Sequence, residues 1–274
     1  KNNIGVYTSE NDLYHIGASP INEFVTIESF LTDFNNSYGT SLPVFNAGYI
    51  DTSRSVISNG VLSETRKQEE IGTSLALHGW PLIAVNYVTP DRSEGMERKP
   101  MEERKLLASF IGAHMPHYRD DSRIKLFEAA KECGRDDVFV DLGNEWHFNK
   151  VVYEEQVLNR EVEAHHIDEH HKKTFRYNSI LSDSKFSLCP EGAGPNTLRF
   201  WESIAVGSIP VIFSEDLAVL NASKFNLTKN LVIWDGEIES KLFDHLASFD
   251  QKVLDKMSSE LKLAYSKVSK EITY

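Results

Sequence analysis

The 274-residue sequence has little cysteine and no long hydrophobic run. Its two cysteines, Cys133 and Cys189, are too few and too isolated for the disulfide framework of a small secreted domain. Reduced thiols fit a cytoplasmic protein. No apolar stretch reaches the roughly 18 residues that a membrane-spanning helix needs, so no span is expected. Because the sequence begins at Lys1, an anchor that precedes this residue stays an open alternative.

Positive charge is also scarce. Lysine and arginine together number 29, aspartate and glutamate number 41, and the formal net charge is −12. A protein that binds nucleic-acid phosphates usually carries a basic face. No basic cluster is visible here, so we expect no nucleic-acid partner. One or two local cations are still enough to bind a single diphosphate group.

Short apolar segments alternate with helical patterns along the chain, which is typical of an α/β fold with parallel sheets. We expect strands at residues 4–7, 43–45, 81–85, 106–111, 138–140, 186–188, 209–212 and 231–234. We expect helices at residues 21–34, 62–77, 120–133, 151–184 and 196–206, and two more helices that close the chain.

A polar stretch at residues 89–104 has two prolines, a glycine and many charges, which is typical of a linker. It predicts two Rossmann-like domains, residues 1–103 and 104–274, with a cleft between them. The final helix, at about 250–272, would be able to pack back on the first domain.

The most informative segment is 186–213, FSLCPEGAGPNTLRFWESIAVGSIPVIF. It has the order strand, glycine-containing loop, helix and strand. Ligands of open parallel sheets bind beyond the carboxyl ends of the strands, and a helix N-terminus offers unpaired N–H groups to an anion. Pro195 suits the first position of a helix. This pattern predicts an anion-binding loop before the helix.

Three side chains of that helix fit a nucleotide ligand. Thr197 adds a hydroxyl group to the first turn. Arg199 and Glu202 are three residues apart and share one helix face, so Arg199 could bind a diphosphate and Glu202 could accept the hydroxyls of a ribose. An ordinary glycine turn with a surface Arg199–Glu202 ion pair explains the same residues equally well.

The segment resembles the exostosin family of inverting glycosyltransferases, which carry F-C-L-x-P-x-G-x-x-x-x-T-x-R-x-x-(E/D)-(A/S)-(I/M)-x-x-G-C-I-P-V-I. The residues in register are Leu188, Pro190, Gly192, Thr197, Arg199, Glu202, Ser203, Ile204, Gly207, Ile209, Pro210 and Val211. Ser187 and Ser208 stand where the family often has Cys. A shorter match, FIGAHMPHYRDDSR at 110–123, resembles the family's F-x-G and S-x-R element, with Ser122 displaced by one place.

The resemblance, which covers roughly residues 104–235, implies a GT-B fold with two Rossmann-like domains. It implies an inverting transfer of a sugar from a UDP-sugar to the hydroxyl group of a glycan or glycoprotein. The implied donor-binding residues are Gly112, Arg123, Pro190, Gly192, Gly194, Asn196, Thr197, Arg199 and Glu202.

Within the family, the chain looks most like the small exostosin-like xylosyltransferases of large algal viruses. Xylose is therefore the expected donor sugar, and the host cytoplasm is the expected location if the chain is viral. Glucuronic acid, galactose, arabinose and N-acetylglucosamine stay open as donor sugars.

No metal or other cofactor is expected. Metal-dependent GT-A transferases usually hold the diphosphate-bound metal with an Asp-x-Asp pair, and this sequence has none. In a GT-B site, a helix dipole and arginines stabilise the leaving diphosphate instead. The segment HHIDEHH places His166 and His170 four residues apart, as in some zinc sites, but without a third ligand nearby a solvated helix is the better explanation.

An inverting transfer also needs a base that takes the proton of the acceptor hydroxyl. We expect it on a loop of the first domain, with Asp12, His15 and Asp51 as the main candidates and Glu10 and Asp91 as further ones. The sequence does not choose among them.

Two other functions stay open. A chain that has lost its base would be a catalytically silent glycan-binding GT-B domain. A sugar-nucleotide epimerase of GT-B shape would bind the same donor without an acceptor.

Overall fold

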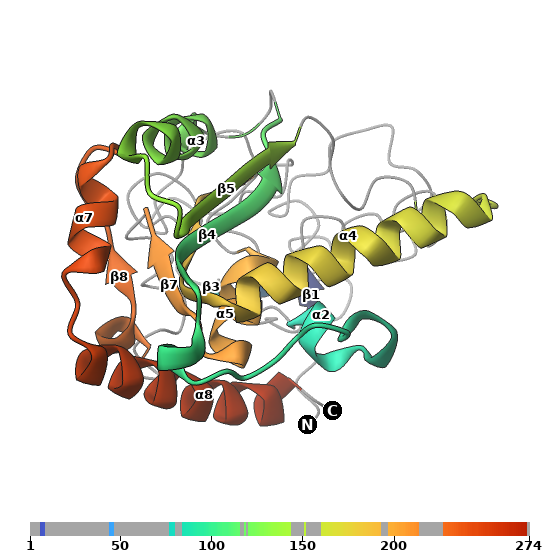
Figure 1. Cartoon of the computed structure of the whole chain (residues 1–274). Coiled ribbons are helices and arrows are strands. Elements are labelled where there is room, and N and C mark those ends of the chain that lie inside the picture. Colours follow the sequence, from blue (N-terminus) through green and yellow to red (C-terminus); the bar gives the residue numbers. More distant parts are fainter. Residues whose placement is uncertain are drawn as a thin grey trace.

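A computed structural model describes residues 6–8, 44–46, 77–79, 84–115, 118, 120–143, 151, 160–192, 197–213 and 227–272. Within these residues, the strands form two sheets, and all the strand pairs in both sheets are parallel (Figure 1). The first sheet has the order β1-β2-β3, with β1 at Val6–Thr8, β2 at Val44–Asn46 and β3 at Leu77–Gly79.

The second sheet has the order β5-β4-β6-β7-β8. Its strands are β4 (Leu106–Ala113), β5 (Val138–Gly143), β6 (Ser184–Cys189), β7 (Ile209–Ile212) and β8 (Val232–Ile233). After β4 the chain adds β5 on one side, then crosses back and adds β6 on the other side. The direction of winding therefore reverses between β4 and β6, and we call this place the switch point.

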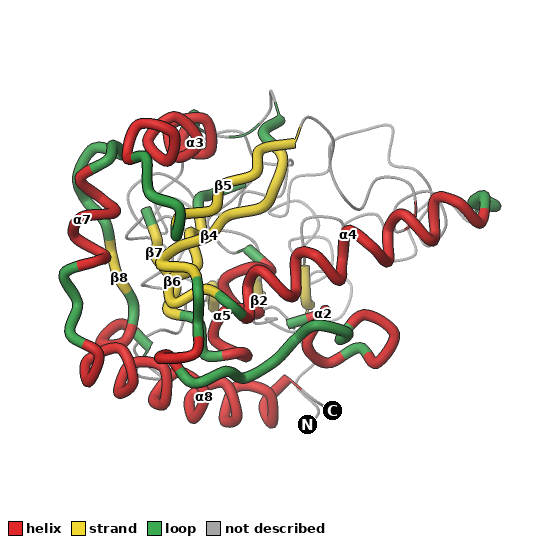
Figure 2. Tube along the Cα trace, viewed as in Figure 1, coloured by secondary structure: helices red, strands yellow, loops and turns green. Residues whose placement is uncertain are grey.

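Helices cover both faces of the second sheet (Figure 2). Helices α3 and α7 contact each other on one face, while α4 and α5 lie together on the other and α8 packs against α5. Their bounds are α2 Val85–Val88, α3 Ser122–Cys133, α4 Ala164–Ser182, α5 Leu198–Val206, α7 Lys241–Ala247 and α8 Gln251–Ile272. Short 3-10 turns are η3 Pro90–Arg92, η4 Met101–Glu103 and η6 Thr228–Asn230.

The core lies between this sheet and its helices. Phe110, Phe186, Phe200 and Trp201 are fully buried and are its largest side chains. Full burial of such a side chain stabilises the fold by about 1.5–3 kcal/mol. Because helices cover both faces, β7 is buried along its whole length and reads as an unbroken apolar run rather than an alternating one.

Helix α5 ends at Gly207, and only glycine fits there. The residue has a φ of 78°, in the left-handed region that side chains disfavour. A Cβ atom at this position would also lie 2.7 Å from Ser258 Oγ of α8. The Ser258 hydroxyl donates to the Gly207 carbonyl at 2.7 Å, so α8 holds the end of α5 directly.

The expected linker, residues 89–104, is fastened to the second sheet and its helices. Arg104 is 3% exposed and donates to the carbonyls of Ser184 at 2.8 Å and Val206 at 2.7 Å. Arg98 donates to the Ala205 carbonyl at 2.7 Å. These guanidinium groups satisfy carbonyls at the end of α5 that have no partner within the helix.

Most sequence expectations for the second half of the chain are confirmed. Helix α3 and strands β4 to β8 lie where the pattern predicts them, and two helices close the chain. The α/β class with two Rossmann-like parallel sheets, as in a GT-B fold, is confirmed. The division into domains at residue 103 stays a prediction. The last helix, α8, contacts a residue before that boundary, since the ring centroids of Tyr265 and Tyr87 are 5.6 Å apart.

Three expectations were wrong. The strand expected at 81–85 is β3, which pairs earlier at Leu77–Gly79, and Val85 begins helix α2. A short apolar run cannot be assigned to a strand or to a helix by its pattern alone. Leu77, where the helix expected at 62–77 would end, belongs to β3, and α4 begins at Ala164 rather than at residue 151. The helix expected at 21–34 lies outside the described residues.

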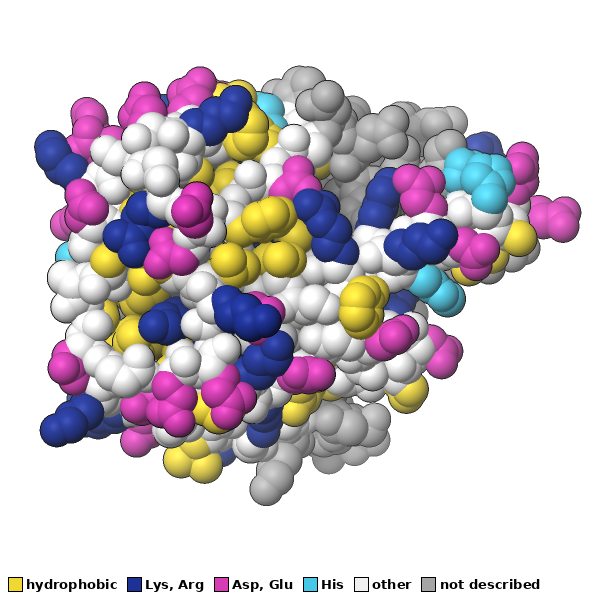
Figure 3. Space-filling view, in the orientation of Figure 1, with side chains coloured by type: hydrophobic (Ala, Val, Ile, Leu, Met, Phe, Trp, Pro, Cys, Tyr) yellow, Lys and Arg dark blue, Asp and Glu magenta, His cyan; other side chains and the backbone are white. Residues whose placement is uncertain are grey.

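The described surface mixes charges of both signs, as Figure 3 shows for one face. Histidine side chains gather at the end of α4 that extends furthest from the sheet (Figure 3). Among the described residues, no helix is long and apolar enough to cross a membrane. In the same residues, no three His, Cys, Asp or Glu side chains are placed to hold a metal ion.

Candidate functional site

The two matched sequence segments meet at the switch point. One follows β4 and leads into α3, and the other follows β6 and leads into α5. Strands β4 and β6 are neighbours and parallel, so both segments leave the sheet at its carboxyl edge. In doubly wound sheets, ligands bind in the crevice at this place, because the two following helices diverge to opposite faces.

Arg123 lies in the first turn of α3 and spans the switch point. Its Nε donates to the Glu191 carbonyl at 2.9 Å, and one terminal nitrogen donates to the Ala113 carbonyl at 2.5 Å. Its guanidinium carbon is 4.4 Å from the centroid of the Tyr118 ring. Burial lowers the pKa of Arg123 to about 10, so the side chain still carries its charge at neutral pH.

Arg199 approaches the same place from the first turn of α5. It donates a hydrogen bond to the Ile111 carbonyl near the end of β4. Its guanidinium carbon is 4.5 Å from the centroid of the Phe110 ring, and that of Arg123 is 5.5 Å from the same ring. One aromatic ring therefore supports both cations.

Arg123 and Arg199, which we call the arginine pair, are close enough to interact electrostatically. Burial has the largest effect on the pKa of Arg123 and lowers it, while Tyr118 raises it. The positive charge of Arg199 is the next cause, and it lowers the pKa of Arg123. Within the described part of the chain, neither guanidinium forms an ion pair with a carboxylate. Two adjacent cations that form no ion pair with a carboxylate among the described residues favour the binding of an anion between them.

The two glycines of the matched motifs leave room for these cations. A Cβ atom on Gly192 would lie 2.9 Å from a terminal nitrogen of Arg123, and one on Gly112 would lie 3.3 Å from a terminal nitrogen of Arg199. Pro190, which follows β6, is buried. Gly194 and Asn196, also expected in the site, lie outside the described residues.

Thr197 is not in the first turn of α5, as the sequence suggested, but at its N-cap. Its hydroxyl accepts from the Phe200 N–H at 3.4 Å, and the helix begins one residue later at Leu198. Threonine with an extended backbone is a good N-cap, so the local chemistry of Thr197 decides where the helix starts. The helix N-terminus still faces the carboxyl edge of the sheet.

Glu202 is 3% exposed, and both of its carboxylate oxygens accept hydrogen bonds. The Asn86 N–H donates to Oε1 at 3.1 Å, and the Tyr177 hydroxyl donates to Oε2 at 2.7 Å. The surface ion pair with Arg199 is therefore wrong. Burial raises the pKa of the Glu202 carboxyl, which these two donors and the nearby Arg199 oppose. Its contact with a ribose stays a prediction.

Sequence reasoning missed the residues that surround Glu202. Asn86 contributes a backbone N–H group, which no side-chain pattern could reveal. Asn178, fully buried in α4, accepts from the Asn86 side chain at 3.1 Å and donates to two backbone carbonyls. The only sequence signal was an amide at a position of α4 that faces the core.

Two buried polar atoms, one just after β4 and one at the start of α3, have no hydrogen-bond partner among the described residues. They are Oγ of Ser122 and Nδ1 of His114. Ser122 is 5% exposed and belongs to the matched S-x-R element. Buried polar groups normally have a partner, so these atoms are suited to a polar ligand at this edge. The base candidates Glu10, Asp12, His15 and Asp51 lie outside the described residues, whereas Asp91 lies within them.

A comparison with protein families now adds to this geometry. The family model for the Exostosin GT47 domain matches residues 50–223, which is more than half of the chain. The chain belongs to the exostosin GT47 family. The resemblance of the 186–213 segment to exostosin glycosyltransferases is thereby confirmed, and both arginines of the pair lie inside the matched region.

No curated protein matches the sequence significantly. Two similar solved structures are a putative UDP-N-acetylglucosamine 2-epimerase from Listeria monocytogenes and S. aureus MnaA in a co-structure with UDP. Both are 11% identical to this chain. The first has a TM-score of 0.42, and its alignment covers 88% of this chain and 68% of the epimerase chain. The second has a TM-score of 0.43, and its alignment covers 90% of this chain and 72% of the MnaA chain. Such distant similarity carries no functional argument.

The buried carboxylate of this GT47 domain allows a test of the contact between Tyr177 and Glu202. Tyr177→Phe removes one donor to Glu202, and we expect a loss of about 1–3 kcal/mol in the free energy of unfolding at pH 7.5. The donor lowers the pKa of Glu202, so the variant raises it further. The loss therefore develops as pH rises and Glu202 ionises, and it is smaller at pH 4.5, where more of the carboxyl is protonated.

Urea unfolding of the wild type and variant at both pH values measures this difference. In a Glu202→Gln background nothing ionises at residue 202, so the cost of Tyr177→Phe should not depend on pH. An equal cost at both pH values in the wild-type background would show that Tyr177 does not stabilise a charged Glu202.

Proposed function

We propose that this chain is an inverting glycosyltransferase that moves a sugar from a UDP-sugar to a glycan hydroxyl group. The observation that carries the proposal is the arginine pair, Arg123 and Arg199, at the switch point of a parallel sheet without a carboxylate partner in the described residues. Membership of the exostosin GT47 family supports it from an independent direction.

The diphosphate of the donor would lie between the two guanidinium groups. A guanidinium has five N–H donors. Arg123 uses two of them on backbone carbonyls and Arg199 uses one, so donors remain on both side chains. The carbonyl bonds hold the cations in place before the donor arrives, and such fixed donors lose little order when the ligand binds.

In the reaction, the acceptor oxygen forms a bond to the anomeric carbon while the bond from that carbon to the diphosphate oxygen breaks. The leaving UDP takes the electron pair of the broken bond, and the proton of the acceptor hydroxyl passes to a base. Negative charge grows on the leaving diphosphate, where Arg123 and Arg199 would stabilise it most in the transition state.

Xylose is our proposed donor sugar, supported by the likeness of the chain to small viral xylosyltransferases. Cytoplasmic location is likewise a proposal, supported by the two separated cysteines, Cys133 and Cys189. The rival functions differ in their products. An epimerase converts the sugar without an acceptor, and a silent glycan-binding domain leaves the UDP-sugar intact.

The first test concerns the arginine pair. Arg199→Ala should lower turnover on the order of 10²–10³-fold, because a fixed donor to the developing charge is lost. Arg123→Ala should lower it as well, and Arg199→Lys should restore only part of the loss, since an ammonium group lacks the planar fork. Steady-state kinetics with UDP-sugar and acceptor measure these effects.

Arg135→Ala is the matched control for these variants. Arg135 is half-exposed and pairs with Asp137 before β5, at the opposite edge of the sheet. It should keep wild-type turnover. Circular dichroism checks that every variant is folded. A folded Arg199→Ala enzyme with wild-type turnover would show that the diphosphate does not bind at this site.

A second test asks whether Glu202 contacts the ribose. We propose that it does, through lone pairs that Asn86 and Tyr177 leave open. Glu202→Gln should then weaken the binding of UDP and UDP-sugar equally, because both contain the ribose. Calorimetry measures both affinities. If the variant binds UDP as tightly as the wild type does, Glu202 does not contact the ribose, and its role is to hold α2 and α4 in place.

A third test concerns metals. The missing Asp-x-Asp motif and the arginine pair support a transfer that needs no divalent cation. We expect most of the activity to survive in EDTA. The measurement is product formation with EDTA and with added Mn²⁺ or Mg²⁺, and a complete loss that Mn²⁺ restores would show that a cation neutralises the diphosphate.

A further inference from the structure

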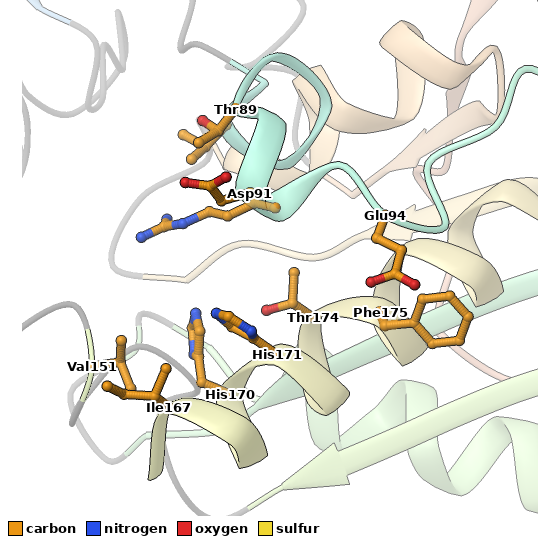
Figure 4. Close-up of a pocket in the computed structure, with 11 residues that line it drawn as sticks. Thr89, Asp91, Glu94, Val151, Ile167, His170, His171, Thr174 and Phe175 are labelled. Carbon is orange, nitrogen blue, oxygen red and sulfur yellow. The ribbon is translucent and has the colours of Figure 1, made fainter. Parts of the chain in front are cut away.

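A pocket lies between α4 and the segment that contains α2 and η3 (Figure 4). Its volume is about 530 Å³, within the range of roughly 300–1,000 Å³ that is usual for small-molecule sites. Val85, Thr89 and Asp91 are on one wall, and Ile167, His171 and Phe175 are on the other. We call it the α2–α4 pocket.

The charge of this pocket differs from that of the arginine pair. Asp91, Arg92 and Glu94 come from the same short segment, so this wall has two carboxylates and one guanidinium. Asp91 and Glu94 are both exposed. This excess of negative charge disfavours a diphosphate and suits a neutral ligand with many hydroxyl groups, which donate to carboxylates.

The opposite wall adds an aromatic ring. Phe175 of α4 is 46% exposed, and Figure 4 shows it beside Glu94 and Thr174 at one end of the pocket. His171, one turn earlier, offers ring nitrogens. A sugar ring has an apolar face of C–H groups and a rim of hydroxyls, and it can therefore contact an aromatic ring and carboxylates at the same time.

The pocket lies at the same edge of the sheet as the arginine pair. Helix α4 runs back from β5 to β6, so its first half, with Ile167 and His171, lies towards the carboxyl ends of these parallel strands. The opposite wall is joined to α5 through the bond from the Asn86 N–H to Glu202. Tyr177, two residues after Phe175, contacts Glu202 and has Arg199 above its ring, with the guanidinium carbon 5.1 Å from the ring centroid.

The wall that holds the carboxylates is fixed in place. The Asn178 side chain donates to the carbonyls of Arg92 at 2.7 Å and Glu94 at 2.8 Å, and its oxygen accepts from Asn86 at 3.1 Å. Asn178 is fully buried, so these bonds are shielded from water. A site whose polar groups are held before binding loses less order when its ligand enters.

We propose that the α2–α4 pocket binds a sugar ring of the acceptor glycan, with Phe175 against its apolar face and the carboxylates of Asp91 and Glu94 on its hydroxyl groups. The inference rests on the proposed function, in that a glycan acceptor is expected beside the donor. A neutral glycan in this pocket complements a charged UDP-sugar at the arginine pair, because the carboxylates of the pocket disfavour a diphosphate there.

The test uses the full chain and an array of neutral oligosaccharides, probed with and without saturating UDP. The oligosaccharide that binds most strongly is then measured by calorimetry against Asp91→Asn, Glu94→Gln and Phe175→Ala. Each variant should lower its affinity about tenfold or more. UDP affinity should stay within about twofold of the wild type, because none of the three residues belongs to the arginine pair.

Two controls match these changes outside the pocket. Glu169→Gln makes the same exchange of a carboxylate for an amide on α4, at a residue that pairs with Lys173. Leu263→Ala shortens an apolar side chain of α8 that is 54% exposed. Both should keep wild-type glycan affinity. Circular dichroism confirms folding. Because the three pocket residues are exposed, we expect their variants to stay folded.

The outcomes separate the pocket from the donor site. Folded pocket variants that keep wild-type glycan affinity, or an array on which nothing binds, would overturn the proposal. Glycan binding that depends on the pocket in a protein that binds no UDP would uphold the pocket and reject the transferase, leaving the silent glycan-binding domain. A third result would reject the pocket alone. In it, Arg199→Ala abolishes UDP binding, but the pocket variants bind the glycan as tightly as the wild type does.

Discussion

The arrangement of the candidate site depends on the reversal of strand order between β4 and β6. Because the chain winds outward on one side of β4 and then returns to the other side, α3 and α5 leave the sheet edge in different directions. Their first turns carry Arg123 and Arg199, which converge over the ring of Phe110. Two like charges so close together repel each other, and an anion between them offsets this repulsion. The proposed binding of an anion therefore depends on topology as much as on residue type.

A buried carboxylate connects this site to the rest of the fold. Glu202 on α5 accepts from Tyr177 on α4 and from the backbone of α2, so one side chain joins three segments that are distant in sequence. Asn178 extends the same network to η3. Burial makes the charge of Glu202 costly unless its partners are in place, which strengthens the dependence of these segments on one another. The two proposed sites, one for an anion and one for a neutral sugar, share this frame.

Local patterns in the sequence predicted much of the second sheet. Strands β4 to β8 and helix α3 follow from apolar runs, glycines and helical spacing, which are properties of short windows. The errors also have local causes. The apolar run at 81–85 is too short for its pattern to distinguish a strand from a helix, and Thr197 caps α5, so the helix begins at Leu198. Arg123 and Arg199 were expected in the site because their motifs resemble a family, and the structure brings them together.

The sequence by itself determined the α/β class, the family and the presence of two arginines at the starts of two helices that follow strands. It did so because these features depend on the order and spacing of nearby residues. Only the tertiary structure decided which groups meet: that Glu202 is buried against Tyr177 and a backbone N–H, and that Asn178 holds the wall of the α2–α4 pocket. These contacts join residues 25 to 116 positions apart, and they form only when the sheet order brings α2, α4 and α5 to one edge.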